Sequence, residues 1–322
     1  MPLYINYPSW IHPQIFPGVP FLGLLRWYGL MYVFAFVTAY LIFQQQVKEG
    51  ALNTPDYTVT DDDVFGFFTT SILMLLLGAR IASCLIYDNT LFYLTKPWLI
   101  FWPFDGNGNF TGLQGMSYHG GVIGGFLGMI LWCRKNKQPM LKWIDAMGIA
   151  IPAGYTFGRL GNFLNGELFG RITTKPWGMI FPAAQKFSSS IPWVAEFAEQ
   201  AGVEVTDRLI NLPRHPSQLY EAFFEGILLF VVLWLLRKKK PFDGFFTGLY
   251  FTGYGVVRFI IEYFREPDVN IGYRIHVTDA PTYLNDSLLN ISTGQILCFI
   301  MIVTGLTILI GHAIWNKKHK KA

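Results

Sequence analysis

The feature that most constrains this chain is a series of seven apolar stretches, each close to the length that crosses a lipid bilayer. A helix needs about 20 residues to span the hydrocarbon core, where its backbone must satisfy its own hydrogen bonds. We therefore expect an all-α integral membrane protein with seven transmembrane helices. The predicted spans are residues 20–43, 64–87, 117–133, 143–164, 217–236, 244–264 and 293–315.

The composition agrees with a membrane protein. Hydrophobic residues make up 52% of the chain and charged residues only 14%, whereas soluble domains contain about 25% charged residues. A further apolar piece, residues 90–104, is short and contains Lys96-Pro97. It is predicted to be an interfacial or re-entrant segment.

Basic clusters at residues 134–137, 237–240 and 317–321 follow three of the predicted spans. Because such clusters favour cytoplasmic loops, the carboxyl terminus is predicted inside and the amino terminus outside. The excursion 165–216 is then a small extracytoplasmic subdomain between helices 4 and 5. Without an internal repeat or long linker, residues 1–322 are predicted to form one polytopic membrane domain. The net charge of +4 reflects this topology and contact with membrane lipids, and no nucleic-acid partner is expected.

The run GRLGNFLNGELFGR at residues 158–171 places polar groups at the end of the fourth span. An arginine near the bilayer centre costs about 2.5–3.5 kcal/mol, so ionisable residues there usually line a site or a water-filled path. Arg159 and Asn162 share one helical face, and a guanidinium fork suits phosphate oxygens. Arg159 is therefore predicted to bind phosphate. The alternative is a structural ion pair with Asp145, Glu221 or Glu262.

The sixth span carries a polar stripe formed by Tyr254, Arg258, Glu262 and Arg265. Such a stripe must face the protein interior rather than lipid. An Arg258–Glu262 ion pair that clamps helices would explain it. Two arginines on separate helices are better explained by a shared anionic ligand.

His119, at the start of the third span, has three possible roles: a base, a phosphate donor, or a hydrogen-bonding partner between helices. Glu221 lies one turn inside the fifth span. Tyr28 belongs either to the interfacial aromatic belt or to a lipid site.

Several common catalytic and binding motifs are missing from the sequence. It has no GxSxG elbow, no Walker loop, and no histidine and carboxylate spacing that suggests a metal site. The three cysteines, Cys84, Cys133 and Cys298, lack metal or redox spacing and are predicted to be small core residues. We expect no metal and no cofactor.

Several segments together resemble bacterial prolipoprotein diacylglyceryl transferases. They are WYGLMY at Trp27, YHGG at Tyr118, GRLGNFLNGELFGR at Gly158, RHPSQLYE at Arg214, YGVVRFIIEYFREPD at Tyr254 and STGQ at Ser292. They follow the family's order and cover nearly the whole chain. The sequence differs from the family pattern at Arg26, where the family often has histidine, so no role is assigned to Arg26.

This resemblance implies a transferase of the bacterial cytoplasmic membrane that acts early in lipoprotein maturation. It implies that the diacylglyceryl group of phosphatidylglycerol moves to the lipobox cysteine thiol of a prolipoprotein, forming a thioether and releasing glycerol phosphate. Arg159 and Arg258 are then expected to bind phosphate and stabilise the transition state, and His119 is the first candidate for accepting the thiol proton. Another basic group or the lipid phosphate are alternative acceptors. The expected substrate-binding residues are Tyr28, Asn162, Glu167, Gly170, Glu221, Tyr254 and Glu262.

Two other functional classes are compatible with outward-facing arginines. A phospholipid transporter or flippase would need a polar route to the inner leaflet, yet few polar residues lie in the inner halves of the spans. A structural membrane protein would explain ion pairs but not the grouping of His119, Arg159 and Arg258 on one side.

Overall fold

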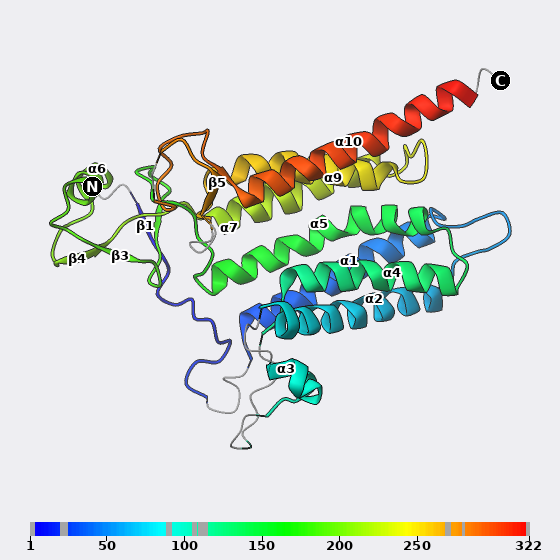
Figure 1. The fold of residues 1–322 in the computed structure, drawn as a ribbon, viewed down its shortest axis with the longest axis horizontal. Helices are drawn as coiled ribbons and strands as arrows, with labels where there is room; N and C mark the ends of the chain where they lie inside the picture. Colours follow the sequence, from blue (N-terminus) through cyan, green and yellow to red (C-terminus); the bar gives the residue numbers. More distant parts are fainter. Residues whose placement is uncertain are drawn as a thin grey trace. The chain divides into compact units, whose positions relative to one another are not determined.

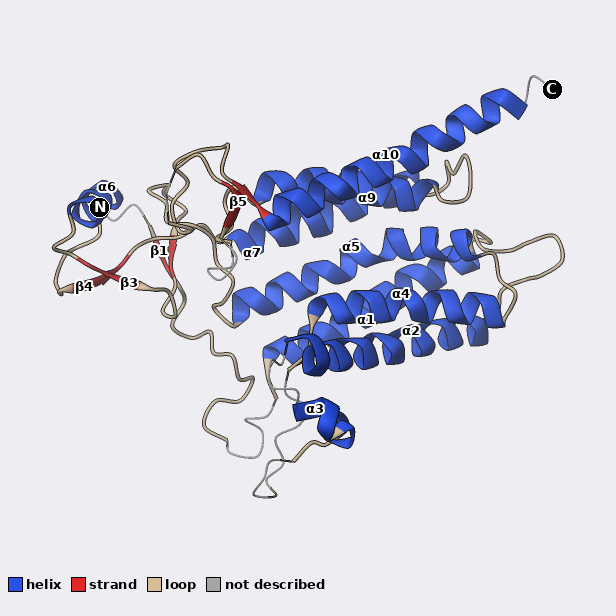
Figure 2. Cartoon of the chain, viewed as in Figure 1, coloured by secondary structure: helices blue, strands red, loops and turns tan. Residues whose placement is uncertain are grey.

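The computed structural model describes residues 4–19, 25–87, 92–104, 108, 115–267, 272–278 and 281–319. These residues are mostly helical, with a few short strands (Figure 2). Four helical segments are long and apolar enough to cross a membrane: Trp27–Lys48, Asp61–Ile86, Ser217–Leu236 and Thr293–His312. The predicted multi-pass, mainly helical membrane protein is confirmed at this level.

Within the described residues, helix covers most of each predicted apolar stretch. The helices are α1 (Trp27–Lys48), α2 (Asp61–Ala82), α4 (Tyr118–Lys135), α5 (Met140–Leu164), α7 (Ser217–Tyr220), α8 (Leu229–Leu236), α9 (Phe245–Ile261) and α10 (Thr293–His319). Two segments are π-helical, η2 (Ser83–Tyr87) and η4 (Glu221–Leu228). The described part of segment 90–104 contains only the short helices α3 (Phe92–Thr95) and η3 (Pro97–Phe101).

The chain divides into two compact units, residues 43–146 and residues 1–42 with 147–322. In the first of these, α2 and α4 run side by side (Figure 1). A Cβ on Gly124 would overlap the carbonyl oxygen of Met74 and lie 3.1 Å from the Cα of Gly78. The absence of side chains at these glycines therefore allows the two backbones to touch.

The unit formed by residues 1–42 and 147–322 contains a second close helix pair, α9 and α10 (Figure 1). Gly248 and Gly305 face each other in this pair, since a Cβ on Gly248 would lie 3.1 Å from the Gly305 carbonyl oxygen. In the same unit, η4 meets α5 where Gly226 lies against Thr156. Helix α9 also packs against η4, so α5, η4 and α9 meet in one unit.

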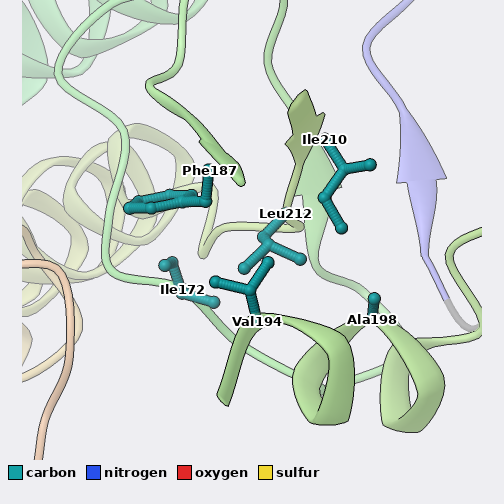
Figure 3. Packing of buried hydrophobic residues seen from close by; sticks show 6 residues of the cluster. All are labelled: Ile172, Phe187, Val194, Ala198, Ile210 and Leu212. Atoms are coloured by element: carbon teal, nitrogen blue, oxygen red, sulfur yellow. The ribbon is translucent and has the colours of Figure 1, made fainter. Parts of the chain in front are cut away.

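The excursion 165–216 contains β2 (Met179–Ile180), β3 (Lys186–Ser188), α6 (Pro192–Ala201) and β4 (Leu209–Asn211). Strands β3 and β4 pair antiparallel, and β2 pairs parallel with β1 (Ile5–Asn6). Helix α6 begins with proline, whose φ suits a first helical turn, and ends at Gly202 with φ 67°. Figure 3 shows the small core of this region, formed by Ile172, Phe187, Val194, Ala198, Ile210 and Leu212.

A last strand pair, β5 (Tyr273–Ile275) with β6 (Ile291–Ser292), leads directly into α10. It is antiparallel, with a register irregularity between Tyr273 and Ile275. The pair delivers Ser292 to the end of α9, where the polar stripe predicted from the sequence is found.

Candidate functional site

The site lies where α5, η4 and α9 meet within one compact unit. We use the name arginine–glutamate cluster for six of its side chains. They are Arg159 from α5, Glu221 and Glu225 from η4, and Arg258, Glu262 and Arg265 from α9 and its carboxyl end. Three guanidinium groups and three carboxylates balance formally, and buried charges are retained in proteins when they are paired in this way.

Glu221 links the two arginines that the sequence singles out. Its Oε2 lies 3.1 Å from Nε of Arg159 and 2.6 Å from Nη1 of Arg258. The Glu221 side chain is completely buried, whereas Arg159 and Arg258 keep 17% and 12% of their surface. One carboxylate oxygen therefore holds two guanidinium groups from different helices together, and part of each arginine side chain stays accessible.

A second connection between these arginines runs through Tyr155 and Glu225. The Tyr155 hydroxyl donates to Oε2 of Glu225 at 2.5 Å, and Oε1 of Glu225 lies 3.4 Å from Nη1 of Arg258. The guanidinium carbon of Arg159 lies 4.7 Å from the centre of the Tyr155 ring, as in a cation–π contact.

Glu262 anchors the other side of Arg258. Its Oε2 lies 3.1 Å from Nη2 of Arg258, and its Oε1 accepts a hydrogen bond from the Ser292 hydroxyl at 2.9 Å. Arg265 Nη1 lies 3.8 Å from the same Oε1. The Arg258–Glu262 pair predicted as a structural alternative is present, and so is a pair between Arg159 and Glu221.

The run GRLGNFLNGELFGR extends the network to the end of α5. Nη1 of Arg159 donates to Oδ1 of Asn162 at 3.3 Å, and Nδ2 of Asn162 donates to Oε1 of Glu167 at 3.0 Å. Tyr28 lies beside this run, because a Cβ on Gly161 would be 3.4 Å from its ring. Its hydroxyl is 3.0 Å from that of Tyr32.

Gly170 and Tyr254 have packing contacts at this site. A Cβ on Gly170 would overlap the Phe264 carbonyl oxygen and lie 2.8 Å from Cβ of His215, so only glycine fits there. The rings of Tyr254 and Tyr155 meet edge to face, 5.8 Å apart. Gly170 thus has a steric reason to be glycine, separate from any contact with substrate.

His119 lies in the other unit, residues 43–146, and is described separately from Arg159 and Arg258. It lies exposed in the first turn of α4, which the Ser117 hydroxyl caps by accepting from the Gly120 amide at 3.1 Å. Its ring contacts that of Tyr118 edge to face at 5.6 Å. The role of His119 stays a prediction.

The sequence reasoning missed Tyr155 and Glu225. Both were detectable, because Tyr155 precedes Arg159 by four residues and Glu225 follows Glu221 by four, spacings that share a helical face. Glu225 is also a carboxylate inside an apolar span, which is an expensive and usually functional placement.

Comparison with known sequences shows which family the chain resembles. The family model for prolipoprotein diacylglyceryl transferase matches residues 19–311. The chain belongs to this family. The resemblance drawn from its motifs is confirmed, and so is the predicted class of enzyme, a transferase.

Individual relatives match nearly the whole chain. It is 56% identical over 335 residues to the phosphatidylglycerol–prolipoprotein diacylglyceryl transferase of Treponema denticola, covering 100% of this chain and 98% of the relative. The Treponema pallidum protein of the same name is 52% identical, with 94% of each chain covered. That of Chlorobaculum tepidum is 42% identical and covers 97% of this chain and 92% of the relative.

Proposed function

We propose that this protein transfers the diacylglyceryl group of phosphatidylglycerol to the lipobox cysteine thiol of a prolipoprotein, the first step of lipoprotein maturation. The family membership and the names of the relatives support this reaction. Phosphatidylglycerol and the lipobox peptide are then its two substrates.

The observation that carries the proposal is the shared contact of Arg159 and Arg258 with one oxygen of Glu221. An arginine has five N–H donors, so a guanidinium group that holds a carboxylate can still donate other N–H groups to an anion. In Arg159, Nε contacts Glu221 and Nη1 contacts Asn162. Among the contacts of the described residues, Nη2 is therefore the nitrogen left to bind a phosphate oxygen. Glu221 thus acts as a fixed support that keeps the two guanidinium groups convergent.

The reaction is an alkylation. The cysteine sulfur attacks a glyceryl carbon, a C–S bond forms, and the C–O bond to the phosphate breaks. The thiol loses its proton, and the electron pair of the broken bond leaves with glycerol phosphate. Arg159 and Arg258 stabilise the charge that develops on the leaving phosphate, which is often the largest catalytic contribution.

His119 accepts the thiol proton in this scheme, because the thiolate is the effective nucleophile. Its exposed position in the first turn of α4 is compatible with contact to a substrate. The alternative role is to position the lipid headgroup.

The remaining site residues form the walls of the headgroup site. Asn162 and Glu167 continue the hydrogen-bond chain from Arg159, and Glu262 holds Nη2 of Arg258 while Glu221 contacts its Nη1. Residues proposed to bind or shape the substrate are Tyr28, Asn162, Glu167, Gly170, Glu221, Tyr254 and Glu262.

The proposed topology has seven membrane-crossing helices in the bacterial inner membrane. The amino terminus and the 165–216 subdomain lie outside, and the carboxyl terminus is cytoplasmic. The basic clusters support this orientation. Labelling of single cysteines in intact cells with a membrane-impermeant reagent tests it. Labelling at residue 208 but not at residue 238 is expected, and the reverse pattern would overturn it.

The test of the reaction uses the purified protein with phosphatidylglycerol vesicles and a synthetic lipobox peptide. Mass spectrometry should detect the peptide thioether, together with one glycerol phosphate per product. Arg159→Ala and Arg258→Ala should each abolish transfer, while the exposed Arg208→Ala should keep the wild-type rate. Undiminished transfer by both site variants would overturn the assignment, and absence of product with the wild type would overturn the reaction.

A further inference from the structure

Five side chains form a closed ring within the site. Going around it, Arg159 contacts Tyr155, Tyr155 contacts Glu225, Glu225 contacts Arg258, Arg258 contacts Glu221, and Glu221 contacts Arg159. Two members, Tyr155 and Glu225, lie outside the set of residues to which binding or catalysis has been assigned above.

We propose that Tyr155 and Glu225 are positioning residues that set the relative orientation of the Arg159 and Arg258 guanidinium groups. The inference rests on the proposed function, because it concerns how these two arginines address one phosphate. Glu221 joins them through a single oxygen, and Asn162 and Glu262 each hold only one of them. Tyr155 and Glu225 supply a second connection that reaches both arginines.

Tyr155 acts on both arginines at once. Its ring lies against the Arg159 guanidinium at 4.7 Å, so the ring plane sets the tilt of that fork. Its hydroxyl donates to Glu225 at 2.5 Å and lies 3.3 Å from Oε2 of Glu221. One rigid side chain therefore couples the tilt of Arg159 to the positions of both carboxylates.

Glu225 is a buried carboxylate that contacts Arg258. Its side chain is completely buried, and its two oxygens are divided between Tyr155 and Arg258. It lies in the π-helical segment η4, and such segments are frequent at functional sites. Close packing of Gly226 on Thr156 keeps η4 and α5 together beside this contact.

Orientation matters because arginine binds phosphate through parallel N–H donors in a plane. Small displacements of catalytic groups are costly, about 100-fold in rate for 1 Å. Loss of the Tyr155–Glu225 hydrogen bond should therefore act on the arginines, lowering the turnover number and weakening binding of the phosphate product.

The test uses Tyr155→Phe, which keeps the ring and removes the hydroxyl, and Glu225→Gln, which keeps the shape and removes the charge. Each should lower kcat by about 10-fold to 100-fold and raise the inhibition constant of glycerol phosphate, when assayed well below the Tm of that variant. The double variant should be no slower than the slower single variant, because both changes break one connection.

A matched control is available at Tyr57, whose hydroxyl donates to Asp63 at 2.8 Å within the other unit, residues 43–146. Tyr57→Phe also removes a tyrosine–carboxylate hydrogen bond, and it should leave kcat and the inhibition constant unchanged.

The outcomes separate the inference from the proposed function. If Arg159→Ala and Arg258→Ala abolish transfer while Tyr155→Phe and Glu225→Gln stay within twofold of wild type, the reaction stands and the positioning role is wrong. The role is also wrong if unfolded protein at the assay temperature accounts for the whole loss of activity, or if the effects of the two changes multiply in the double variant. Absence of transfer by the wild type would count against the reaction itself.

Discussion

Arg258 donates to Glu221 across 2.6 Å, and the carboxylate that receives this contact is completely buried. Arg159 contacts the same carboxylate oxygen at 3.1 Å. Removing one partner of a buried ion pair leaves a charge without compensation, which costs more than the pair contributes. Glu221 is therefore the side chain on which both stability and arginine geometry depend.

Glu221→Ala should lower the free energy of unfolding by about 3–5 kcal/mol and abolish transfer, because two guanidinium groups lose their common acceptor. Thermal unfolding in detergent and the peptide assay measure both effects. The control is Asp243→Ala, which breaks an exposed pair with Lys240 at 2.9 Å and should cost less than about 1 kcal/mol. Equal effects of the two variants would contradict the buried-pair argument.

Gly226→Ala should disrupt the contact between η4 and α5. A Cβ there would overlap the Thr156 hydroxyl and lie 3.1 Å from its Cα, and overpacking of this kind costs about 1–3 kcal/mol. Transfer should also fall, because η4 carries Glu221. Gly311→Ala is the matched control, since its Cβ would meet nothing within 4 Å. A Gly226→Ala protein with wild-type Tm and rate would show that the two segments are less tightly packed.

His119→Gln should lower kcat by about 100-fold to 10,000-fold if the imidazole accepts the thiol proton. If His119 positions the headgroup, KM for phosphatidylglycerol should rise while kcat changes little. Steady-state kinetics with varied lipid concentration distinguish these results. Wild-type values of both constants would remove His119 from the mechanism.

His215, just before α7, should make stability depend on pH. Burial, followed by the nearby charges of Lys175 and Arg171, lowers the pKa of His215 from 6.5 to about 4. Between these values the unfolded chain binds the proton more readily than the folded chain, so stability falls as the pH drops from about 6.5 towards 4.

The loss associated with His215 should approach about 2–3 kcal/mol. Melting temperatures at pH 7.5 and pH 5 measure it. His215→Phe keeps a ring against Phe264 and should reduce the difference between the two temperatures. An unchanged difference would assign the pH dependence to other groups.

Leu212→Ala should weaken the small core of the 165–216 excursion. Leu212 is completely buried in that core, and truncating a buried leucine costs about 2–5 kcal/mol. Limited proteolysis should then cut the excursion more rapidly. Leu209→Ala is the control, because Leu209 begins β4, the strand that directly precedes Leu212, and has 55% of its surface exposed. Equal cleavage rates for the two variants would show that this core contributes little.

Much of the fold and part of the site were predictable from local patterns. Apolar runs of span length mark where the helices lie, since a bilayer excludes unpaired backbone polar groups. The four-residue steps from Tyr254 to Arg258 and Glu262 place these side chains on one helical face. The order of several motifs in one chain indicated the family, which the comparisons confirm.

The carboxylate that pairs with each arginine was not predictable in the same way. For Arg159 the sequence left Asp145, Glu221 and Glu262 open, and the structure pairs it with Glu221. Such pairing depends on which helices touch and at what depth, and helical periodicity within one segment carries no information on either. The close approach of Gly226 to Thr156 sets that depth for η4 and α5.

The sequence by itself determined that this is a membrane protein, which stretches become helices and to which family it belongs. These properties follow from local hydrophobicity and motif identity. Only the tertiary structure decided that one oxygen of Glu221 serves two arginines and that Tyr155 and Glu225 close the ring around them. Those relationships join residues up to about a hundred positions apart in the chain, where packing between helices, and not the pattern within any one of them, sets the distance.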